Sequence, residues 1–199
     1  MATGADDRPR PRRVGIFGGT FDPPHVGHVS VARDVGDQLS LDEIVWLPAR
    51  HSPLKPDEPL TDPRVRLAMV QAAADLDPRF RVDGRELERE GPSFTVDTLN
   101  ELREGPFAGD VEVFLIIGID QYRAFHEWKA PHEIQGLARL AVMDRDGEGA
   151  NNDALSVPVR RVDVSSTQIR ERVQAGEDVG PLVPPAVARI IETEGLYRT

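Results

Sequence analysis

The sequence predicts an α/β fold in which helices cover both faces of a doubly wound parallel sheet. Short apolar segments alternate with segments of helical periodicity throughout the chain. The first apolar segment, 13–17, runs directly into glycines, which is typical of a buried parallel strand that turns into a helix. The 199 residues, 39% of them hydrophobic, suit one domain. We therefore expect a single domain over 13–199, preceded by a flexible polar leader over 1–12.

The first strand–helix–strand unit is the most regular one. The strand at 13–17 is "RVGIF", a short run that contains β-branched residues. The segment 25–39 carries valines at helical spacing and therefore predicts a helix with one apolar face. The segment 43–49, "EIVWLPA", predicts the second strand, which a proline stops.

The middle of the chain predicts two helices around a third strand. The segment 62–76 has an Asp-Pro start, which suits a helix N-cap followed by its first residue. The segment 80–87, "FRVDGREL", alternates as a strand does. The segment 92–104 predicts a helix capped near Ser93 or Thr95.

The second half of the chain continues the alternation. Its most apolar segment, 111–118, predicts a central strand, and further strands are expected at 138–145 and 157–164. Further helices are expected at 120–127, 131–137, 166–176 and 184–195.

Composition excludes several classes of protein. A net charge of −10 disfavours a general binder of nucleic acid or of anionic membranes. The absence of cysteine excludes disulfides, thiolate nucleophiles and cysteine metal sites. No apolar run approaches the roughly 18 residues that a membrane span needs. The polar opening lacks the apolar core of a secretory signal, so we expect a cytoplasmic protein.

The segment "GGTFDPPHVGH" follows the first strand and carries more glycine, proline and histidine than a turn requires. Gly18 and Gly19 let the backbone approach a ligand closely and offer N–H donors. His25 and His28 are three residues apart, so we expect them side by side in the first turn of the next helix. A helix N-terminus that carries two imidazoles suits a phosphate chain. The segment lacks the Gly-Lys-Ser/Thr of a P-loop and the Gly-x-Gly-x-x-Gly of nicotinamide or flavin oxidoreductases.

This segment resembles the signature of nucleotidyltransferases with a His-x-Gly-His motif, and specifically that of the bacterial nicotinate-nucleotide adenylyltransferases. Three further blocks resemble the same family, namely "GPSFTVDTL" (91–99), "GIDQYRAFHEWK" (118–129) and "VSSTQIR" (164–170). The ending "LVPPAVARIIETEGLY" also resembles the family's last helix, so the resemblance covers 13–197. It implies a Rossmann-like nucleotidyltransferase fold.

The resemblance implies transfer of the adenylyl group of ATP to nicotinate mononucleotide, which gives nicotinate adenine dinucleotide and pyrophosphate in NAD biosynthesis. The nucleophile would be a phosphate with a second pKa near 6, so the reaction needs no general base. The site must align two anions and stabilise the leaving pyrophosphate. The resemblance assigns these tasks to His25, His28, Lys55 and Arg170.

The same resemblance assigns residues to each substrate. ATP is expected to contact Gly18, Gly19, Thr20, Phe21, Ser165, Ser166 and Thr167. The mononucleotide is expected to contact Thr95, Gly118, Asp120 and Trp128, with the indole stacked on the pyridine ring and Asp120 accepting ribose hydroxyls. Mg²⁺ is implied, but it would be held through the substrate phosphates, because no carboxylate cluster resembles a cage.

Each assignment has a plainer alternative. The serines before Arg170 commonly cap a helix, Trp128 commonly belongs to a core, Asp120 commonly caps a helix, and Lys55 commonly lies in solvent. The other histidines are expected in solvent, namely His51, His126 and His132.

The sequence departs from the family at Leu54, where the family often has histidine before the retained Lys55. Two alternative functions stay open. One is transfer of a nucleotidyl group to another phosphorylated acceptor such as phosphopantetheine, and the other is a non-catalytic nucleotide sensor. A monomer and a homo-oligomer are equally compatible with the sequence.

Overall fold

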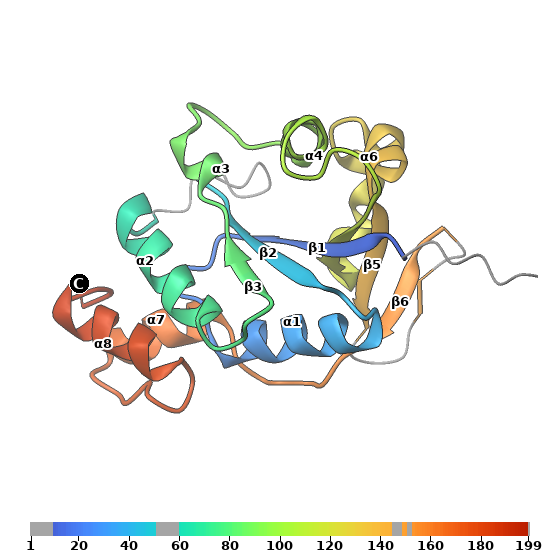
Figure 1. The fold of residues 1–199 in the computed structure, drawn as a ribbon. Helices are drawn as coiled ribbons and strands as arrows, with labels where there is room; N and C mark the ends of the chain where they lie inside the picture. Colours follow the sequence, from blue (N-terminus) through green and yellow to red (C-terminus); the bar gives the residue numbers. More distant parts are fainter. Residues whose placement is uncertain (1–9, 51–59, 145–148, 151–152, 199) are drawn as a thin grey trace, which may run out of the picture.

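A six-stranded, all-parallel sheet forms the centre of the molecule and confirms the predicted fold class (Figure 1). The computed structural model describes residues 10–50, 60–144, 149–150 and 153–198. The strands lie in the order β3-β2-β1-β4-β5-β6, which is the order of a doubly wound sheet. Their bounds are Arg12–Gly19 (β1), Glu43–Pro48 (β2), Phe80–Val82 (β3), Val111–Gly118 (β4), Arg139–Asp144 (β5) and Leu155–Pro158 (β6).

Helices cover both faces of this sheet. Helices α4 and α6 lie on one face, and α1 and α2 lie on the other, where α2 also contacts α8 (Figure 1). The helices are α1 (Val26–Gln38), α2 (Pro63–Ala74), α3 (Arg85–Glu88), α4 (Thr95–Glu104), α5 (Ile119–Arg123), the 3₁₀ helix η1 (Phe125–Glu127), α6 (Pro131–Leu137), α7 (Ser166–Gln174) and α8 (Pro185–Thr193).

The central strands are apolar throughout because both of their faces are buried. In β4, Phe114 and Ile116 pack into the core under α1, whereas Leu115 and Ile117 pack into the core under α4 and α6. Successive side chains of a strand point to opposite faces, so a strand between two helical layers needs apolar residues at every position. This explains why the predicted strand 111–118 coincides with β4.

The predicted strand at 80–87 is wrong in its second half. The strand ends at Val82, and Arg85 starts the short helix α3. The Asp83 carboxylate accepts the backbone N–H of Arg85 at 3.0 Å, while the N–H of Asp83 donates to the carbonyl of Trp46. This aspartate turn ends the strand and favours the helix over further alternation.

The predicted strand at 157–164 is also too long, since β6 ends at Pro158. Its neighbour β5 ends at Asp144, and the backbone N–H of Arg160 donates to the Asp34 carboxylate on α1 at 2.9 Å instead of to a strand. The predicted cap of the helix at 92–104 is wrong as well. Helix α4 begins at Thr95 without a side-chain cap.

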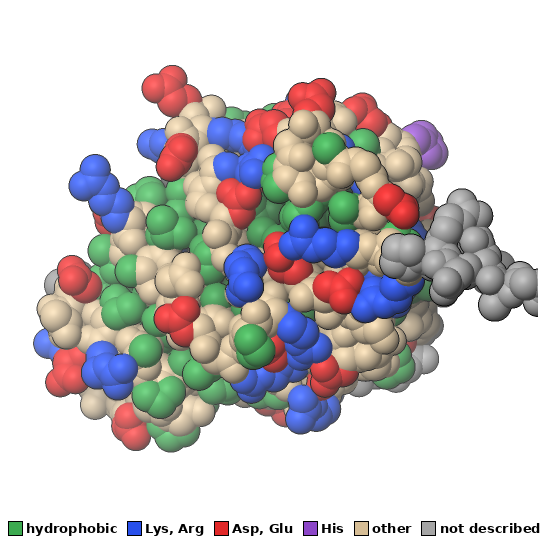
Figure 2. Space-filling view, in the orientation of Figure 1, with side chains coloured by type: hydrophobic (Ala, Val, Ile, Leu, Met, Phe, Trp, Pro, Cys, Tyr) green, Lys and Arg blue, Asp and Glu red, His purple; other side chains and the backbone are tan. Residues whose placement is uncertain are grey.

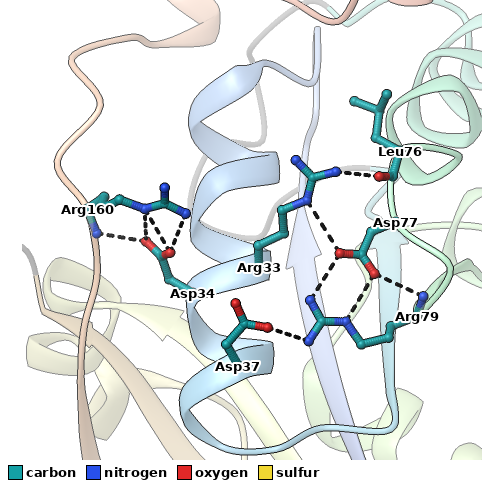
Figure 3. Close-up of polar contacts among 7 residues, drawn as sticks. All are labelled: Arg33, Asp34, Asp37, Leu76, Asp77, Arg79 and Arg160. Carbon is teal, nitrogen blue, oxygen red and sulfur yellow. Dashed lines mark hydrogen bonds and ion pairs between the residues drawn. The ribbon is translucent and has the colours of Figure 1, made fainter.

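Ion pairs fix the exposed side of α1 between two other segments (Figure 3). Asp34 binds Arg160, which follows β6, and Asp37 binds Arg79, which follows α2. Arg79 also binds Asp77. A single exposed pair stabilises a protein by about 0–1 kcal/mol, but a network that joins three segments restricts the position of the helix. Positive and negative side chains are interspersed over this face of the molecule (Figure 2).

The described residues at the edge of the predicted leader are attached to the sheet. Strand β1 begins at Arg12, and Arg10 forms an ion pair with Asp42 at 2.6 Å. Residues 1–9 lie outside the described part, so the leader stays a prediction.

Candidate active site

Two adjoining pockets lie at the carboxyl ends of β1 and β4. The connections of these strands leave in opposite directions, to β2 and to β5, and such a switch point is where α/β sheets bind ligands. We call one of these two pockets the histidine pocket and the other the tryptophan pocket. The first is lined by His25, Gly27, His28, Ser165, Ser166, Thr167 and Arg170, and the second by Glu86, Phe94, Thr95, Thr98, Trp128 and Lys129. Both are lined by Gly18, Gly19, Thr20 and Gln121, so they share one wall.

His25 and His28 form a reciprocal cap at the start of α1. Nδ1 of His25 accepts the backbone N–H of His28 at 3.4 Å, and Nδ1 of His28 accepts the backbone N–H of His25 at 3.2 Å. His25 is therefore the N-cap residue just before the helix, rather than part of its first turn as expected. The rings stack with centroids 3.6 Å apart. A neutral imidazole whose Nδ1 accepts carries its proton on Nε2, so the cap makes each Nε2 a donor.

Gly27 makes this stacked arrangement possible. A Cβ atom at this position would lie 3.0 Å from Nδ1 of His25 and 3.0 Å from Cγ1 of Val164. The glycine of the His-x-Gly-His motif thus lets the His25 ring and the segment before α7 approach closely without the shifts that a Cβ atom would require.

A second helix N-terminus, that of α7, faces the same pocket. Ser165 is its N-cap residue and accepts the N–H of Gln168 at 3.1 Å, as a capping serine does. The Ser166 hydroxyl donates to the carbonyl of Pro23 at 2.8 Å, and Arg170 donates to the carbonyl of Asp22 at 2.8 Å. Neither α1 nor α7 has an acidic residue in its first turn. The partial positive ends of two helices therefore converge on one pocket.

The segment 18–22, which starts with the last two residues of β1 and which we call the glycine loop, contributes Gly18, Gly19 and Thr20 to the shared wall. A Cβ atom on Gly18 would have no heavy atom within 4 Å, so this residue borders open space. Phe21 lines the histidine pocket, but its ring is buried against Phe17 and Trp46, with centroids 5.4 Å and 5.2 Å away. Phe21 therefore contributes mainly to the pocket floor.

The tryptophan pocket combines aromatic rings with backbone donors. Trp128 packs on Phe125 with ring centroids 5.4 Å apart. Its buried Nε1 has no hydrogen-bond partner among the described residues, so this donor suits a ligand atom. Thr95 is the first residue of α4, where backbone N–H groups have no partner within the helix.

Glu86 is an acid in this pocket that the sequence did not indicate. Its side chain is 9% exposed, and its carboxylate accepts the Thr98 hydroxyl at 2.6 Å. Burial raises the pKa of Glu86 above its ordinary value, and the hydrogen bond from Thr98 only partly offsets that effect. Nothing in the surrounding sequence distinguishes this glutamate from a solvated one.

The structure does not bring Gly118 and Asp120 into either pocket. Gly118 is the N-cap residue of α5, and the side chain of Asp120 is 91% exposed. Gln121 lines both pockets instead, and its side-chain carbonyl accepts the N–H of Gly118 at 3.2 Å. The predicted strand end was correct, but the residue that faces the site is one position further along.

The remaining predicted residues divide into two groups. His126 and His132 are exposed and line neither pocket, as expected. His51, Leu54 and Lys55 lie outside the described residues.

The described residues show neither a protein metal cage nor a membrane-spanning helix. They contain no group of three or more His, Cys, Asp or Glu side chains that could hold a metal ion. In the same part of the chain, no helix has the length and apolarity that crossing a membrane requires.

Comparison with known proteins identifies close relatives. A family model described as cytidylyltransferase-like matches residues 16–172. A protein of Shouchella clausii, named as a probable nicotinate-nucleotide adenylyltransferase, is 39% identical over 188 residues, which span 94% of this chain and 97% of that protein. A protein of Geobacillus thermodenitrificans with the same name is 41% identical over 187 residues, or 93% of this chain and 86% of that protein.

A similar fold is found in a solved structure. The nicotinic acid mononucleotide adenylyltransferase of Plasmodium falciparum, solved in complex with NaAD, superposes with a TM-score of 0.74. The superposition covers 94% of this chain and 97% of that chain at 17% identity.

Proposed function

The chain belongs to the nicotinate-nucleotide adenylyltransferases, within the cytidylyltransferase-like family, and we propose that its two adjoining pockets carry out the reaction of that family. The enzyme transfers the adenylyl group of ATP to nicotinate mononucleotide, forming nicotinate adenine dinucleotide and pyrophosphate in NAD biosynthesis. The observation that carries the proposal is the wall of Gly18, Gly19, Thr20 and Gln121 common to both pockets. A transfer between two bound substrates requires two sites that meet at the reacting phosphates.

ATP is proposed to occupy the histidine pocket. Nε2 of His25 and Nε2 of His28 would donate to its phosphates, the N-termini of α1 and α7 would add partial positive charge, and Arg170 would reach the same oxygens. An oxygen of the acceptor phosphate attacks the α-phosphorus, and the bond to the bridging oxygen of the β-phosphate breaks. Negative charge grows on the departing pyrophosphate, where donors are most effective. Lys55 is proposed to add a further positive charge, although it lies outside the described residues.

Nicotinate mononucleotide is proposed to occupy the tryptophan pocket. The Trp128 ring would stack on the pyridine, while Thr95 and the start of α4 would donate to its carboxylate. The side chain of Asp120 points into solvent, so it could contact the ribose only after a movement of α5. Gln121 lines the pocket and is therefore the better placed hydrogen-bond partner for the ribose hydroxyls. The phosphate of the mononucleotide would point to the shared wall. Since that phosphate is largely ionised at neutral pH, no base has to remove a proton.

Mg²⁺ is proposed to be bound by the substrate phosphates. Asp22 is the acidic residue that lines the histidine pocket, and its two carboxylate oxygens accept hydrogen bonds from Tyr197 and Thr61. The donor set of this pocket therefore suits an anion better than a protein-held cation. When bound, Mg²⁺ would neutralise part of the phosphate charge. The cytoplasm, where ATP is available, is the compartment that we propose for the reaction.

The acid mononucleotide is the proposed acceptor in preference to the amide. A site that offers N–H donors satisfies both oxygens of a carboxylate, whereas a carboxamide directs its NH₂ group at one of them. An unpaired buried donor costs about 1–3 kcal/mol, and the charge of the acid strengthens its hydrogen bonds. We therefore expect a preference on the order of 10²-fold in kcat/KM.

Two substitutions test the assignment of substrates to pockets. Trp128→Ala should raise KM for nicotinate mononucleotide far more than KM for ATP, because the indole lines only the tryptophan pocket. Arg170→Ala should lower kcat and raise KM for ATP. Equal effects of Trp128→Ala on both KM values would contradict the assignment. A wild-type protein that binds ATP but transfers no adenylyl group would instead favour the nucleotide sensor.

A further inference from the structure

Asp22 joins three segments that are far apart in the sequence. Its side chain is only 2% exposed. One carboxylate oxygen accepts the Tyr197 hydroxyl at 2.5 Å, and the other accepts the backbone N–H of Thr61 at 2.9 Å. Its backbone carbonyl accepts Arg170 at 2.8 Å. The residue that ends the glycine loop is thus tied to α7, to the start of α2 and to the C-terminal segment.

Arg66 on α2 binds the backbone of the segments that adjoin Asp22. Its side chain is 1% exposed and donates to four backbone carbonyls at 2.6–3.2 Å, those of Thr20, Ala49, Arg50 and Thr61. These carbonyls belong to the glycine loop and to the residues on either side of 51–59. Burial lowers the pKa of Arg66, but the nearby Asp22 carboxylate favours its charged form. The buried Arg66 guanidinium and the buried Asp22 carboxylate therefore attract each other without a direct hydrogen bond among the described contacts.

Tyr197 reaches Asp22 with an unusual backbone conformation. Its φ angle is 61°, in the left-handed region that residues other than glycine rarely adopt. Phe21, next to Asp22, has a φ angle of 51°. Such conformations persist only where the surrounding structure enforces them, and they gather at functional sites. Burial and the Asp22 carboxylate also raise the pKa of Tyr197 well above its ordinary value, so its hydroxyl remains a donor.

We propose that Tyr197 is a positioning residue for the ATP half of the reaction: its hydroxyl holds the Asp22 carboxylate, and through it the glycine loop and Arg170, in the arrangement that receives the triphosphate. This inference rests on the proposed function. No contact between Tyr197 and substrate is involved, because Asp22 lines the histidine pocket and Tyr197 does not.

The hydrogen bond from Tyr197 matters for ATP binding because Asp22 carries a negative charge. A carboxylate beside a triphosphate site repels the substrate, and the hydrogen bonds from Tyr197 and Thr61 fix its oxygens so that they cannot turn toward the phosphates. With Tyr197→Phe, one buried oxygen loses its donor, and the carboxylate gains by turning toward solvent in the histidine pocket. That turn would bring negative charge to the phosphates and move the carbonyl that Arg170 contacts. The tryptophan pocket, which Asp22 does not line, would be unaffected.

The chain offers a matched control for this substitution. Its two tyrosines both donate to an aspartate, Tyr197 to Asp22 and Tyr122 to Asp153 at 2.7 Å. Tyr122 lines neither pocket. Tyr122→Phe therefore removes the same kind of hydrogen bond from a different place.

Steady-state kinetics with the full chain test the proposal, with thermal unfolding measured for each variant. Tyr197→Phe should raise KM for ATP by about ten-fold and lower kcat, with KM for nicotinate mononucleotide near the wild-type value, whereas Tyr122→Phe should change neither KM. Adding Asp22→Asn to Tyr197→Phe should restore much of the affinity for ATP, because it removes the misplaced charge. If the contact were merely structural, Tyr197→Phe would lower the unfolding temperature without raising KM for ATP selectively, and Asp22→Asn would not restore the affinity for ATP.

The outcomes separate the two proposals. If the wild-type protein transfers no adenylyl group to nicotinate mononucleotide, the proposed function fails. If the wild type is active but Tyr197→Phe leaves KM for ATP unchanged, or raises both KM values equally, only the role of Tyr197 is overturned.

Discussion

Substitution of Gly27 by alanine tests whether the stacked histidines are held in a catalytic geometry. The added Cβ would lie 3.0 Å from Nδ1 and 3.1 Å from Cε1 of His25, and 3.0 Å from Cγ1 of Val164. Such contacts require shifts of a few tenths of an ångström in the His25 ring or in the segment before α7. Overpacking of this kind costs about 1–3 kcal/mol, and the helix preference of alanine offsets roughly 0.5–1 kcal/mol of it. A misplacement of 1 Å can cost about 10²-fold in rate, so a smaller shift should lower kcat about ten-fold.

Gly36→Ala is the matched control for this substitution. Gly36 lies in the same helix, and its Cβ would be 2.9 Å from Cδ1 of Ile44 and 3.0 Å from Nη1 of Arg79, which is drawn beside α1 in Figure 3. Both variants should lose similar stability in urea unfolding, but only Gly27→Ala should lose kcat in a pyrophosphate-release assay. Equal kcat values in the two variants would show that crowding at Gly27 affects only stability and that the position of the His25 ring does not limit catalysis.

Three further substitutions follow from the site. Gly18→Ala should leave the unfolding temperature unchanged, since its Cβ meets no heavy atom within 4 Å, but should lower kcat/KM, because the methyl group enters the space where the pockets meet; unchanged kinetics would place the substrates elsewhere. Arg170→Lys should restore only part of the activity that Arg170→Ala removes, because an ammonium lacks the planar fork, and full activity of the lysine variant would contradict this role. Glu86→Gln should alter the pH dependence of stability: the pKa of Glu86 is raised in the fold, so the unfolded chain ionises first, and the stability of the wild type relative to the variant should fall as pH rises above about 4.5. Urea midpoints between about pH 4 and 7 measure this, and a constant difference would disprove it.

The fold was largely predictable because its signals are local. The central strands are continuous apolar runs, and helices such as α2 begin at an N-cap residue that the sequence displays, here Asp62, whose carboxylate accepts the N–H of Arg64 at 2.8 Å. The histidine pocket was predictable for the same reason. His25, His28 and Ser165 all lie at helix starts that directly follow recognisable signals.

The parts that were not predicted depend on contacts between distant segments. Arg66 has the sequence context of an ordinary helical arginine, and only the carbonyls of three other segments make its burial possible. The end of β6 depends on Asp34, more than a hundred residues earlier in the chain. Gln121 rather than Asp120 faces the pockets because α5 begins directly at the end of β4, which sets the direction of each side chain. Periodicity within one segment carries none of this information.

The identity of the product formed from the two substrates tests the proposed function most directly. Purified protein is incubated with ATP and Mg²⁺ together with nicotinate mononucleotide, its amide counterpart or phosphopantetheine, and pyrophosphate and dinucleotide are measured together. We expect one nicotinate adenine dinucleotide for each pyrophosphate, a much lower rate with the amide and no reaction with phosphopantetheine. Pyrophosphate release that is independent of nicotinate mononucleotide, or that is faster with phosphopantetheine, would contradict the assignment of the tryptophan pocket to a pyridine nucleotide.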